Sequence, residues 1–304
     1  MTILALSGLA LCSGAWGQVL EVPRDFATIQ EALDAAPSRG VVIVRGGTWD
    51  TITIRKPVTL IGDPPAVLAG GGSCPVELPN CGPWAPPIIL LGQGSGDVTL
   101  SGITTGGGVP PGFGAPSRIP PGISGGNFSK LHIYDSGILA PDWTGGLSGL
   151  GYGNSAIDVG VSLIVLERSF VKGSRTDIDD TCSGNPAHWS PPPGINAPGS
   201  TVVVLDSHVQ GGDMGRFQFL QWPTPQDCDP SNCPLLPGGI GISCAVLYHA
   251  GSTIEGGRGA QWSNCLSGGQ GSFFCCQSPP GAPLQVGSEI PLQDDLQIIG
   301  PIRL

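Results

Sequence analysis

The feature that most constrains the fold of this chain is a short motif that recurs from residue 102 onward. The segments SFVKGS (169–174), SHVQGG (207–212) and STIEGG (252–257) share the form Ser-x-[Val/Ile]-x-Gly-[Gly/Ser]. Weaker copies are GITTGG (102–107) and SGILAP (136–141), so that successive copies start 34, 33, 38 and 45 residues apart. Recurrence at such intervals is typical of a solenoid in which each copy occupies one coil.

The unequal intervals predict that each coil carries an inserted loop. A simple solenoid coil needs only about two dozen residues, and Gly/Pro-rich stretches at 108–126, 140–154, 180–199 and 216–239 supply the excess. The chain has 50 glycines and 31 prolines, a share that alone suggests low complexity. Runs such as VVIVRG, LIVLER and TVVVLD are strand-like, so we expect short β-strands joined by long loops.

Strand alternation predicts the direction of each side chain in the motif. The Val or Ile must face the core, so the Ser two residues earlier also faces inward and both x positions face outward. Because neighbouring coils stack about 4.8 Å apart, equivalent outward residues form ladders. The expected ladders are Phe170–His208–Thr253, Lys172–Gln210–Glu255 and, just past the glycines, Arg175–Asp213–Arg258.

The beginning of the sequence predicts export. Residues 1–17 combine a short apolar run with Ala15-Trp16-Gly17, which places small residues where a signal peptidase cuts. We therefore expect a signal peptide over 1–17, one domain over 18–304, and a secreted or extracytoplasmic protein. No later segment has the unbroken apolar length of a membrane span.

The cysteines agree with export. Nine follow the expected signal, at positions 74, 81, 182, 228, 233, 244, 265, 275 and 276. They lie largely in loops without the paired spacing of a zinc site, so disulfides are expected, with Cys74–Cys81 and Cys228–Cys233 as natural short loops. The odd number leaves one thiol free or intermolecular.

The segment from Val19 to Asp63 begins with a helix signal. Thr28 and Glu31 form a capping box, and Phe26, Ile29, Leu33 and Ala36 give one apolar helical face. The run V-P-x-D-F-x-T-I-Q-x-A-L-D-A-A-P, followed by V-x-I-V-x-G-G-T-W and K-P-V-T-L-I-G-D, resembles the opening of pectinesterases and of the wider pectin-lyase-like superfamily. The resemblance implies an all-β, single right-handed parallel β-helix whose N-terminal end is capped by this α-helix.

The same resemblance implies a place to look for catalysis. Pectinesterases use aspartates, an arginine and glutamines in motifs of the forms Gln-Asp-Thr-Leu, Asp-Phe-Ile-Phe-Gly and Leu-Gly-Arg-Pro-Trp, none of which is intact here. The nearest segment is QGGDMGRFQF, where Gln210, Asp213 and Arg216 have the right residue types in a different arrangement. These three are the candidate catalytic residues.

Other polar and aromatic residues are candidates for binding saccharide or metal. The substrate-binding candidates are His208, Lys172, Glu255, Arg175, Arg258, Trp189 and Trp222. Tryptophan faces bind sugar rings, and charged pairs bind hydroxyls or carboxylates. The alternative is that the charges form a surface ion-pair ladder worth about 0–1 kcal/mol per pair. No cofactor is expected, with calcium at Asp177, Asp179 and Asp180 as the alternative that similarity to pectate lyases implies.

The net charge and the absence of intact catalytic motifs together indicate the class of function. The chain carries a net charge of −10, only 12% charged residues and three lysines, which argues against nucleic acid or an anionic membrane as partner. We therefore expect a secreted, non-catalytic carbohydrate-binding or cell-surface protein, whose partner is a polysaccharide or a cell-surface glycan. The alternative is a polysaccharide-active enzyme, an esterase or lyase that acts on acidic polysaccharide such as pectin.

Overall fold

The computed structural model describes the chain in separate segments, and all structural statements below concern these residues. They are residues 19–71, 85–106, 120–142, 154–178, 191–217, 238–259, 261–262, 280, 282, 284–291 and 297–299. The four insertion loops predicted above and most of the cysteines lie largely or wholly outside them. Within this part of the chain, no helix is long and apolar enough to cross a membrane.

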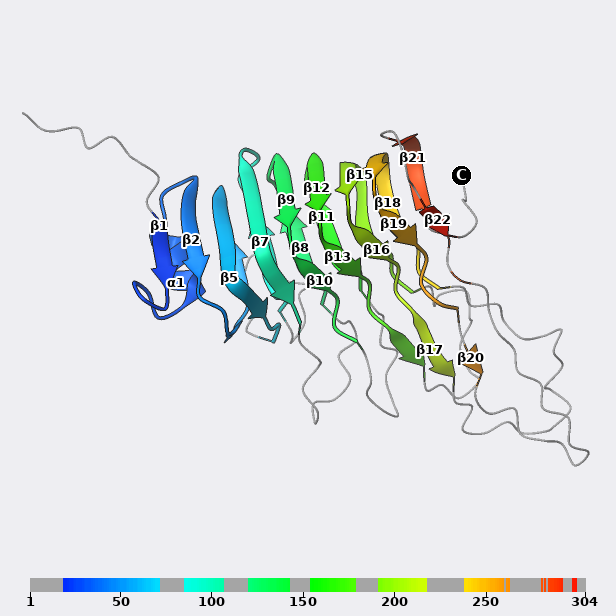
Figure 1. The fold of residues 1–304 in the computed structure, drawn as a ribbon, viewed down its shortest axis with the longest axis horizontal. Coiled ribbons are helices and arrows are strands. Elements are labelled where there is room, and N and C mark those ends of the chain that lie inside the picture. Colours follow the sequence, from blue (N-terminus) through cyan, green and yellow to red (C-terminus); the bar gives the residue numbers. More distant parts are fainter. Residues whose placement is uncertain are drawn as a thin grey trace, which may run out of the picture.

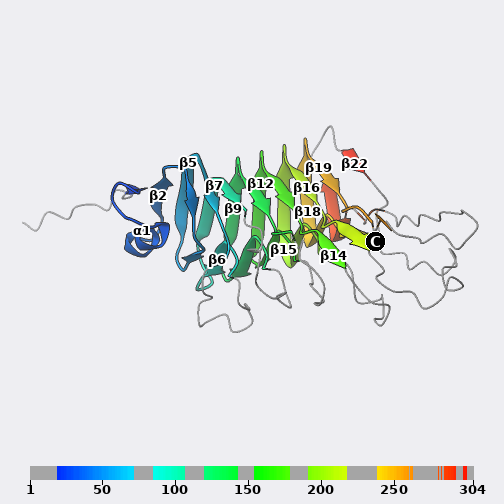
Figure 2. The ribbon, with the colours of Figure 1, turned by 90° about the horizontal axis from the view of Figure 1, so that it is seen from below.

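Short parallel strands stack along one axis into an elongated solenoid (Figures 1 and 2). The strands are β1 (Val19–Val22), β2 (Gly40–Val44), β3 (Thr48–Trp49), β4 (Ile52–Ile54), β5 (Val58–Leu68), β6 (Ile88–Leu91), β7 (Asp97–Thr105), β8 (Ile123–Gly126), β9 (Lys130–Tyr134), β10 (Gly137–Leu139), β11 (Ile157–Gly160), β12 (Leu163–Glu167), β13 (Phe170–Lys172), β14 (Thr176–Ile178), β15 (Ile195–Leu205), β16 (His208–Gln210), β17 (Met214–Phe217), β18 (Ile242–Ala250), β19 (Thr253–Glu255), β20 (Gln261–Trp262), β21 (Leu284–Pro291) and β22 (Gln297–Ile299).

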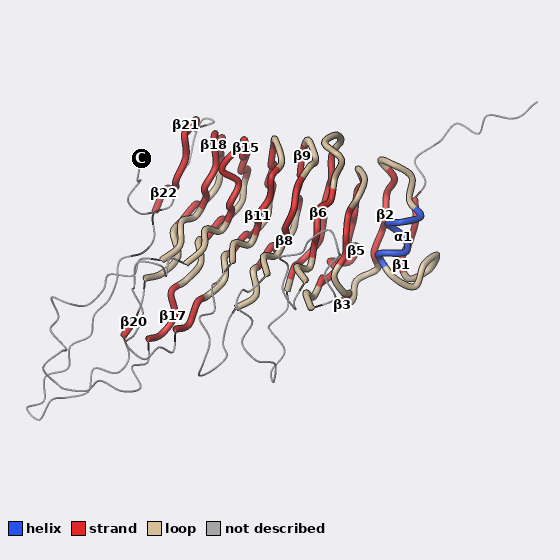
Figure 3. Tube along the Cα trace, turned by 180° about the vertical axis from the view of Figure 1, so that it is seen from behind, coloured by secondary structure: helices blue, strands red, loops and turns tan. Residues whose placement is uncertain are grey.

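Strand pairing defines three faces of the solenoid. Face A contains β1, β2, β9, β12 and parts of β5, β7, β15, β18 and β21. Face B contains β3, β10, β13, β16, β19, β22 and the ends of β5 and β7. Face C contains β4, β6, β8, β11 and the beginnings of β15, β18 and β21. Figure 3 shows the coils stacked from the α1 end to β21 and β22.

The core consists of apolar ladders that run along the axis inside each face. On face A, Leu60, Leu100, Ile133, Leu166 and Val204 occupy successive register positions, and all are fully buried. Strands β9 and β12 alternate buried residues with more exposed ones, as a strand with one face on a core must. The prediction of an all-β fold made of parallel stacked strands is therefore confirmed.

The serine of the motif also lies inside, as predicted, and it joins each coil to the next. The Ser169 hydroxyl accepts the Ser136 N–H at 3.2 Å, the Ser207 hydroxyl accepts the Ser169 N–H at 3.0 Å, and the Ser252 hydroxyl accepts the Ser207 N–H at 3.1 Å. Each hydroxyl also donates to the carbonyl two residues earlier, as Ser207 does to Leu205. The buried serines thus form a polar ladder at the corner between faces A and B.

The register expected for the first copy of the motif was wrong by one residue. The alignment placed Gly102 beside Ser136, whereas Thr104 pairs with Gly137 and the Ile103 N–H donates to the Ser136 hydroxyl. Thr105 consequently faces the core, where it is fully buried. Its hydroxyl donates to the Leu139 carbonyl at 2.9 Å and accepts the Leu139 N–H at 2.8 Å, so an inward threonine is satisfied there.

Most of the variation in coil length falls in one connection. In the coils of β9, β12, β15 and β18, two residues connect face A to face B, as from Tyr134 to Gly137 and from Glu167 to Phe170. The long connections run from face B to the next strand of face C, as from Leu139 to Ile157. Three successive connections, after β13, β16 and β19, each contribute one strand to a separate three-stranded parallel sheet of β14, β17 and β20. Insertion on one side of the solenoid is therefore confirmed.

The predicted helix is α1 (Ile29–Ala35), and its capping box is formed. Thr28 accepts the Glu31 N–H, and the Glu31 carboxylate accepts the Thr28 N–H. The helix buries Ile29, Ala32 and Leu33 and contacts β1, β2 and β4 at the N-terminal end of the stack (Figure 2). Its role as a cap that closes the core stays a prediction.

One cysteine lies within the described residues. Cys244 is a buried free thiol in β18, and burial raises its pKa to about 12. The other eight cysteines after the expected signal, and both expected disulfides, lie outside the described part of the chain. If the other eight cysteines form four disulfides, Cys244 is the one thiol that the odd number leaves free.

Candidate functional site

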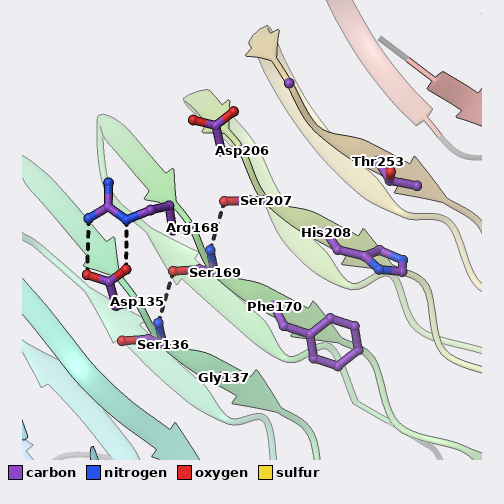
Figure 4. A pocket seen from close by; sticks show the side chains of 11 residues that line it. Asp135, Ser136, Gly137, Arg168, Ser169, Phe170, Asp206, Ser207, His208 and Thr253 are labelled. Atoms are coloured by element: carbon purple, nitrogen blue, oxygen red, sulfur yellow. Dashed lines mark hydrogen bonds and ion pairs between the residues drawn. The ribbon is translucent and has the colours of Figure 1, made fainter. Parts of the chain in front are cut away.

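A groove of about 740 Å³ crosses four consecutive coils at the corner where face A turns into face B (Figure 4). The corner contributes one charged or small residue from each coil, and the beginning of face B contributes a second. The lining residues are Asp135, Ser136, Gly137, Arg168, Ser169, Phe170, Asp206, Ser207, His208, Gly251 and Thr253. With coils about 4.8 Å apart, the groove runs roughly 14 Å along the solenoid axis.

The corner residues adopt a left-handed backbone conformation. The φ angle is 47° at Asp135, 46° at Arg168, 47° at Asp206 and 58° at Gly251, each directly before a ladder serine. Asp and Gly tolerate this region better than most residues, and the turn it makes projects the side chain outward. The corner therefore presents Asp, Arg, Asp and Gly in successive coils.

Arg168 is held by two acidic neighbours. Its guanidinium donates Nε–H to Asp135 Oδ1 at 2.8 Å and Nη2–H to Asp135 Oδ2 at 3.0 Å, a two-pronged contact across one coil step (Figure 4). A further nitrogen contacts Glu167. The hydrogen bond from Arg168 lowers the pKa of the Asp135 carboxyl, and the hydrogen bond to Asp135 raises the pKa of Arg168.

The face B wall of the groove is the predicted ladder of Phe170, His208 and Thr253, with Gly137 at its N-terminal end. Phe170 is one of the two large hydrophobic residues that are exposed among the described residues, at 37%. Its ring meets the His208 ring edge-on, with centroids 5.2 Å apart and an interplanar angle of 82°. Gly137 has no side chain to cover Phe170 from the preceding coil, so an aromatic surface faces the groove (Figure 4).

The second predicted ladder is also formed, and its members make contacts beside the groove. Lys172, Gln210 and Glu255 occupy successive register positions. His208 Nε2 lies 2.9 Å from Glu255 Oε1, a diagonal contact between neighbouring strands. The structure therefore brings His208 and Glu255 together at one end of the groove wall.

Asp213, one of the three candidate catalytic residues, has partners at both oxygens. Oδ2 pairs with Lys172 Nζ at 3.0 Å, and Oδ1 accepts the Arg258 N–H at 2.8 Å. Its side chain is only 14% exposed. Asp142 makes the equivalent contact with the Arg175 N–H at 2.9 Å. These contacts give Asp213 a part in fixing the turn after face B.

The remaining predicted residues are placed only in part. Arg216 belongs to β17, where it pairs with Gln261, and Asp177 belongs to β14; the side chains of both are outside the description. Trp189, Trp222, Asp179 and Asp180 lie outside the described residues altogether. In the described segments, no group of three His, Cys, Asp or Glu side chains has the arrangement of a metal site. The calcium prediction remains untested.

Sequence reasoning gave little weight to the corner. None of Asp135, Arg168 and Asp206 is among the candidate residues predicted from the sequence. The signal was available, because all three residues occupy the position directly before a motif serine. Aspartate in two of these coils and glycine at 251 are residue types that tolerate positive φ, and their recurrence at one position indicates a tight corner.

Comparison with known proteins adds no relative. No family model matches the chain, and neither a search of curated proteins nor one of solved structures finds a match. The similarity of residues 19–63 to pectinesterases therefore remains a resemblance in that segment.

Proposed function

We propose that this chain is a secreted, non-catalytic protein that binds a linear polysaccharide or cell-surface glycan along the groove between faces A and B. We further propose that the chain is a right-handed, pectin-lyase-like β-helix with a signal peptide over 1–17 and disulfide-tied loops. The observation that carries the proposal is the exposed Phe170 ring, with the carboxylates of Asp135 and Asp206 in the coils before and after it.

The proposal follows from the chemistry of sugars. A hexose offers an apolar C–H face and a rim of hydroxyls, which an aromatic ring and carboxylate oxygens respectively bind. The groove supplies the ring of Phe170 and the carboxylate of Asp206, and the carboxylate of Asp135 lines it while paired with Arg168. A coil spacing of about 4.8 Å is comparable to the length of one hexose unit, so successive units can meet successive coils.

The enzyme alternative receives less support from the same residues. A catalytic carboxylate needs an oxygen that reaches substrate, whereas both oxygens of Asp213 already have protein partners. The ion pair and the backbone contact also limit its exposure. Incubation with methyl-esterified and de-esterified pectin, with and without calcium, tests this alternative through methanol release and absorbance of unsaturated products. Turnover in either assay would contradict the non-catalytic proposal.

Binding itself is tested with Phe170→Ala and soluble linear oligosaccharides in titration calorimetry. Loss of the ring should weaken binding about 2- to 12-fold, the size of one aromatic contact. Tyr248→Ala is the matched control. Tyr248 also faces outward, but it is half-buried and lies on face A. Equal effects of the two substitutions, or binding by neither variant nor the parent protein, would contradict the proposed site.

A further inference from the structure

We propose that Asp206 makes the groove selective for glycans without carboxylates, so that amino-bearing polymers bind more tightly than neutral ones and uronic-acid polymers bind least. This inference rests on the proposed function, and names the ligand class of the same groove. It concerns a residue that belongs to none of the catalytic, binding or metal candidates predicted from the sequence.

Asp206 differs from the other charged residues of the corner because its carboxylate has no partner among the described residues. Its side chain is exposed and makes no hydrogen bond or ion pair with any described residue, whereas Asp135 and Arg168 are bound to each other. Arg168 also contacts Glu167, so this guanidinium is already paired with two carboxylates of the protein. The free charge at the centre of the groove is therefore negative.

The next coil leaves room for this carboxylate. A Cβ at Gly251 would collide with Asp206 Oδ1, so only glycine at that corner allows Asp206 its present position over the following coil. Gly251 also has φ 58°, a second reason for glycine there. The glycine therefore leaves room for Asp206 Oδ1 against the corner of the following coil.

The described side chains that line the groove include one Lys or Arg, Arg168, and it is already paired with carboxylates. Among the groove-lining side chains, two carboxylates face one guanidinium, and Glu167 and Glu255 lie directly beside the groove in contact with Arg168 and His208. Lys172, the nearest lysine on face B, pairs with Asp213. A sugar carboxylate would meet like charge here, whereas a sugar ammonium or hydroxyl finds acceptors.

The test uses three hexasaccharides of equal length in titration calorimetry at low ionic strength. They are the glucosamine oligomer in mildly acidic buffer, the glucose oligomer and the galacturonic acid oligomer. The proteins are the parent chain, Asp206→Asn and Asp50→Asn. Asn tolerates positive φ, so Asp206→Asn preserves the corner, and Asp50 is an exposed carboxylate between β3 and β4 that controls for overall charge.

The parent protein should bind the glucosamine oligomer most tightly and the galacturonic acid oligomer least. Asp206→Asn should weaken the first about 2- to 5-fold and strengthen the last, the size of one exposed charge pair, while Asp50→Asn changes neither. Tightest binding of the galacturonic acid oligomer by the parent protein, or equal effects of the two substitutions, would overturn this inference but leave the proposed function intact. Failure of all three oligomers to bind would overturn both.

Discussion

Removal of one ladder serine tests the corner in detail. In Ser207→Ala the Ser169 N–H loses its acceptor at 3.0 Å, and both residues are about 5% exposed, so water does not replace it. The Leu205 carbonyl loses the Ser207 hydroxyl but keeps the Arg168 N–H at 3.1 Å. One buried donor is therefore left unsatisfied, which costs about 1–3 kcal/mol.

This free energy corresponds to a measurable change in thermal stability. Each kcal/mol shifts Tm by about 2–4 °C in domains of roughly 150–250 residues, so Ser207→Ala should lower Tm by roughly 2–12 °C. Thermal unfolding followed by far-UV circular dichroism measures it, and amide hydrogen exchange of the 167–172 segment should show faster exchange at Ser169.

Ser243→Ala is the matched control for this change. It deletes the same hydroxyl from a half-buried residue that faces outward on face C, so its effect should stay within about 0.5 kcal/mol. If Ser207→Ala were as stable as Ser243→Ala, with unchanged exchange at Ser169, the inward serine ladder would not contribute to stability.

Two further predictions follow from buried or half-buried titratable groups. Because burial raises the pKa of Cys244 to about 12, its thiol should resist disulfide-exchange reagents in mildly alkaline native protein and react on unfolding; rapid native labelling would contradict its placement. Partial burial lowers the pKa of His132 below 6.5, so the unfolded state binds that proton more tightly and stability should fall as pH drops below 6.5. His132→Gln should reduce this slope in Tm measured between neutral and mildly acidic buffer, and an unchanged slope would refute the assignment.

The periodic part of the fold could be predicted from the sequence because its cause is local. Val171, Val209 and Ile254 occupy the same inward position, and each is fully buried, as the motif predicts. The alignment at Gly102 failed because it matched the glycines of the motif, which placed Thr104 inward and Thr105 outward. Thr105 faces inward instead, because Leu139 in the next coil satisfies its hydroxyl.

The site was less predictable because it depends on contacts between coils. Register placed His208 beside Thr253, but its long side chain reaches diagonally to Glu255. The choice of Asp135 as the partner of Arg168 likewise depends on side-chain geometry across a corner, which a linear pattern does not contain. Sequence therefore located the outward ladders, and the structure was needed to identify the groove beside them.

The central claim is that a glycan lies in the groove between faces A and B, parallel to the solenoid axis. A crystal structure of the protein with a bound glucosamine hexasaccharide tests this most directly. We expect a sugar ring against Phe170, a hydroxyl or ammonium within hydrogen-bond distance of Asp206, and successive sugar units over successive coils. An oligosaccharide bound on another face, with the groove unoccupied, would contradict it.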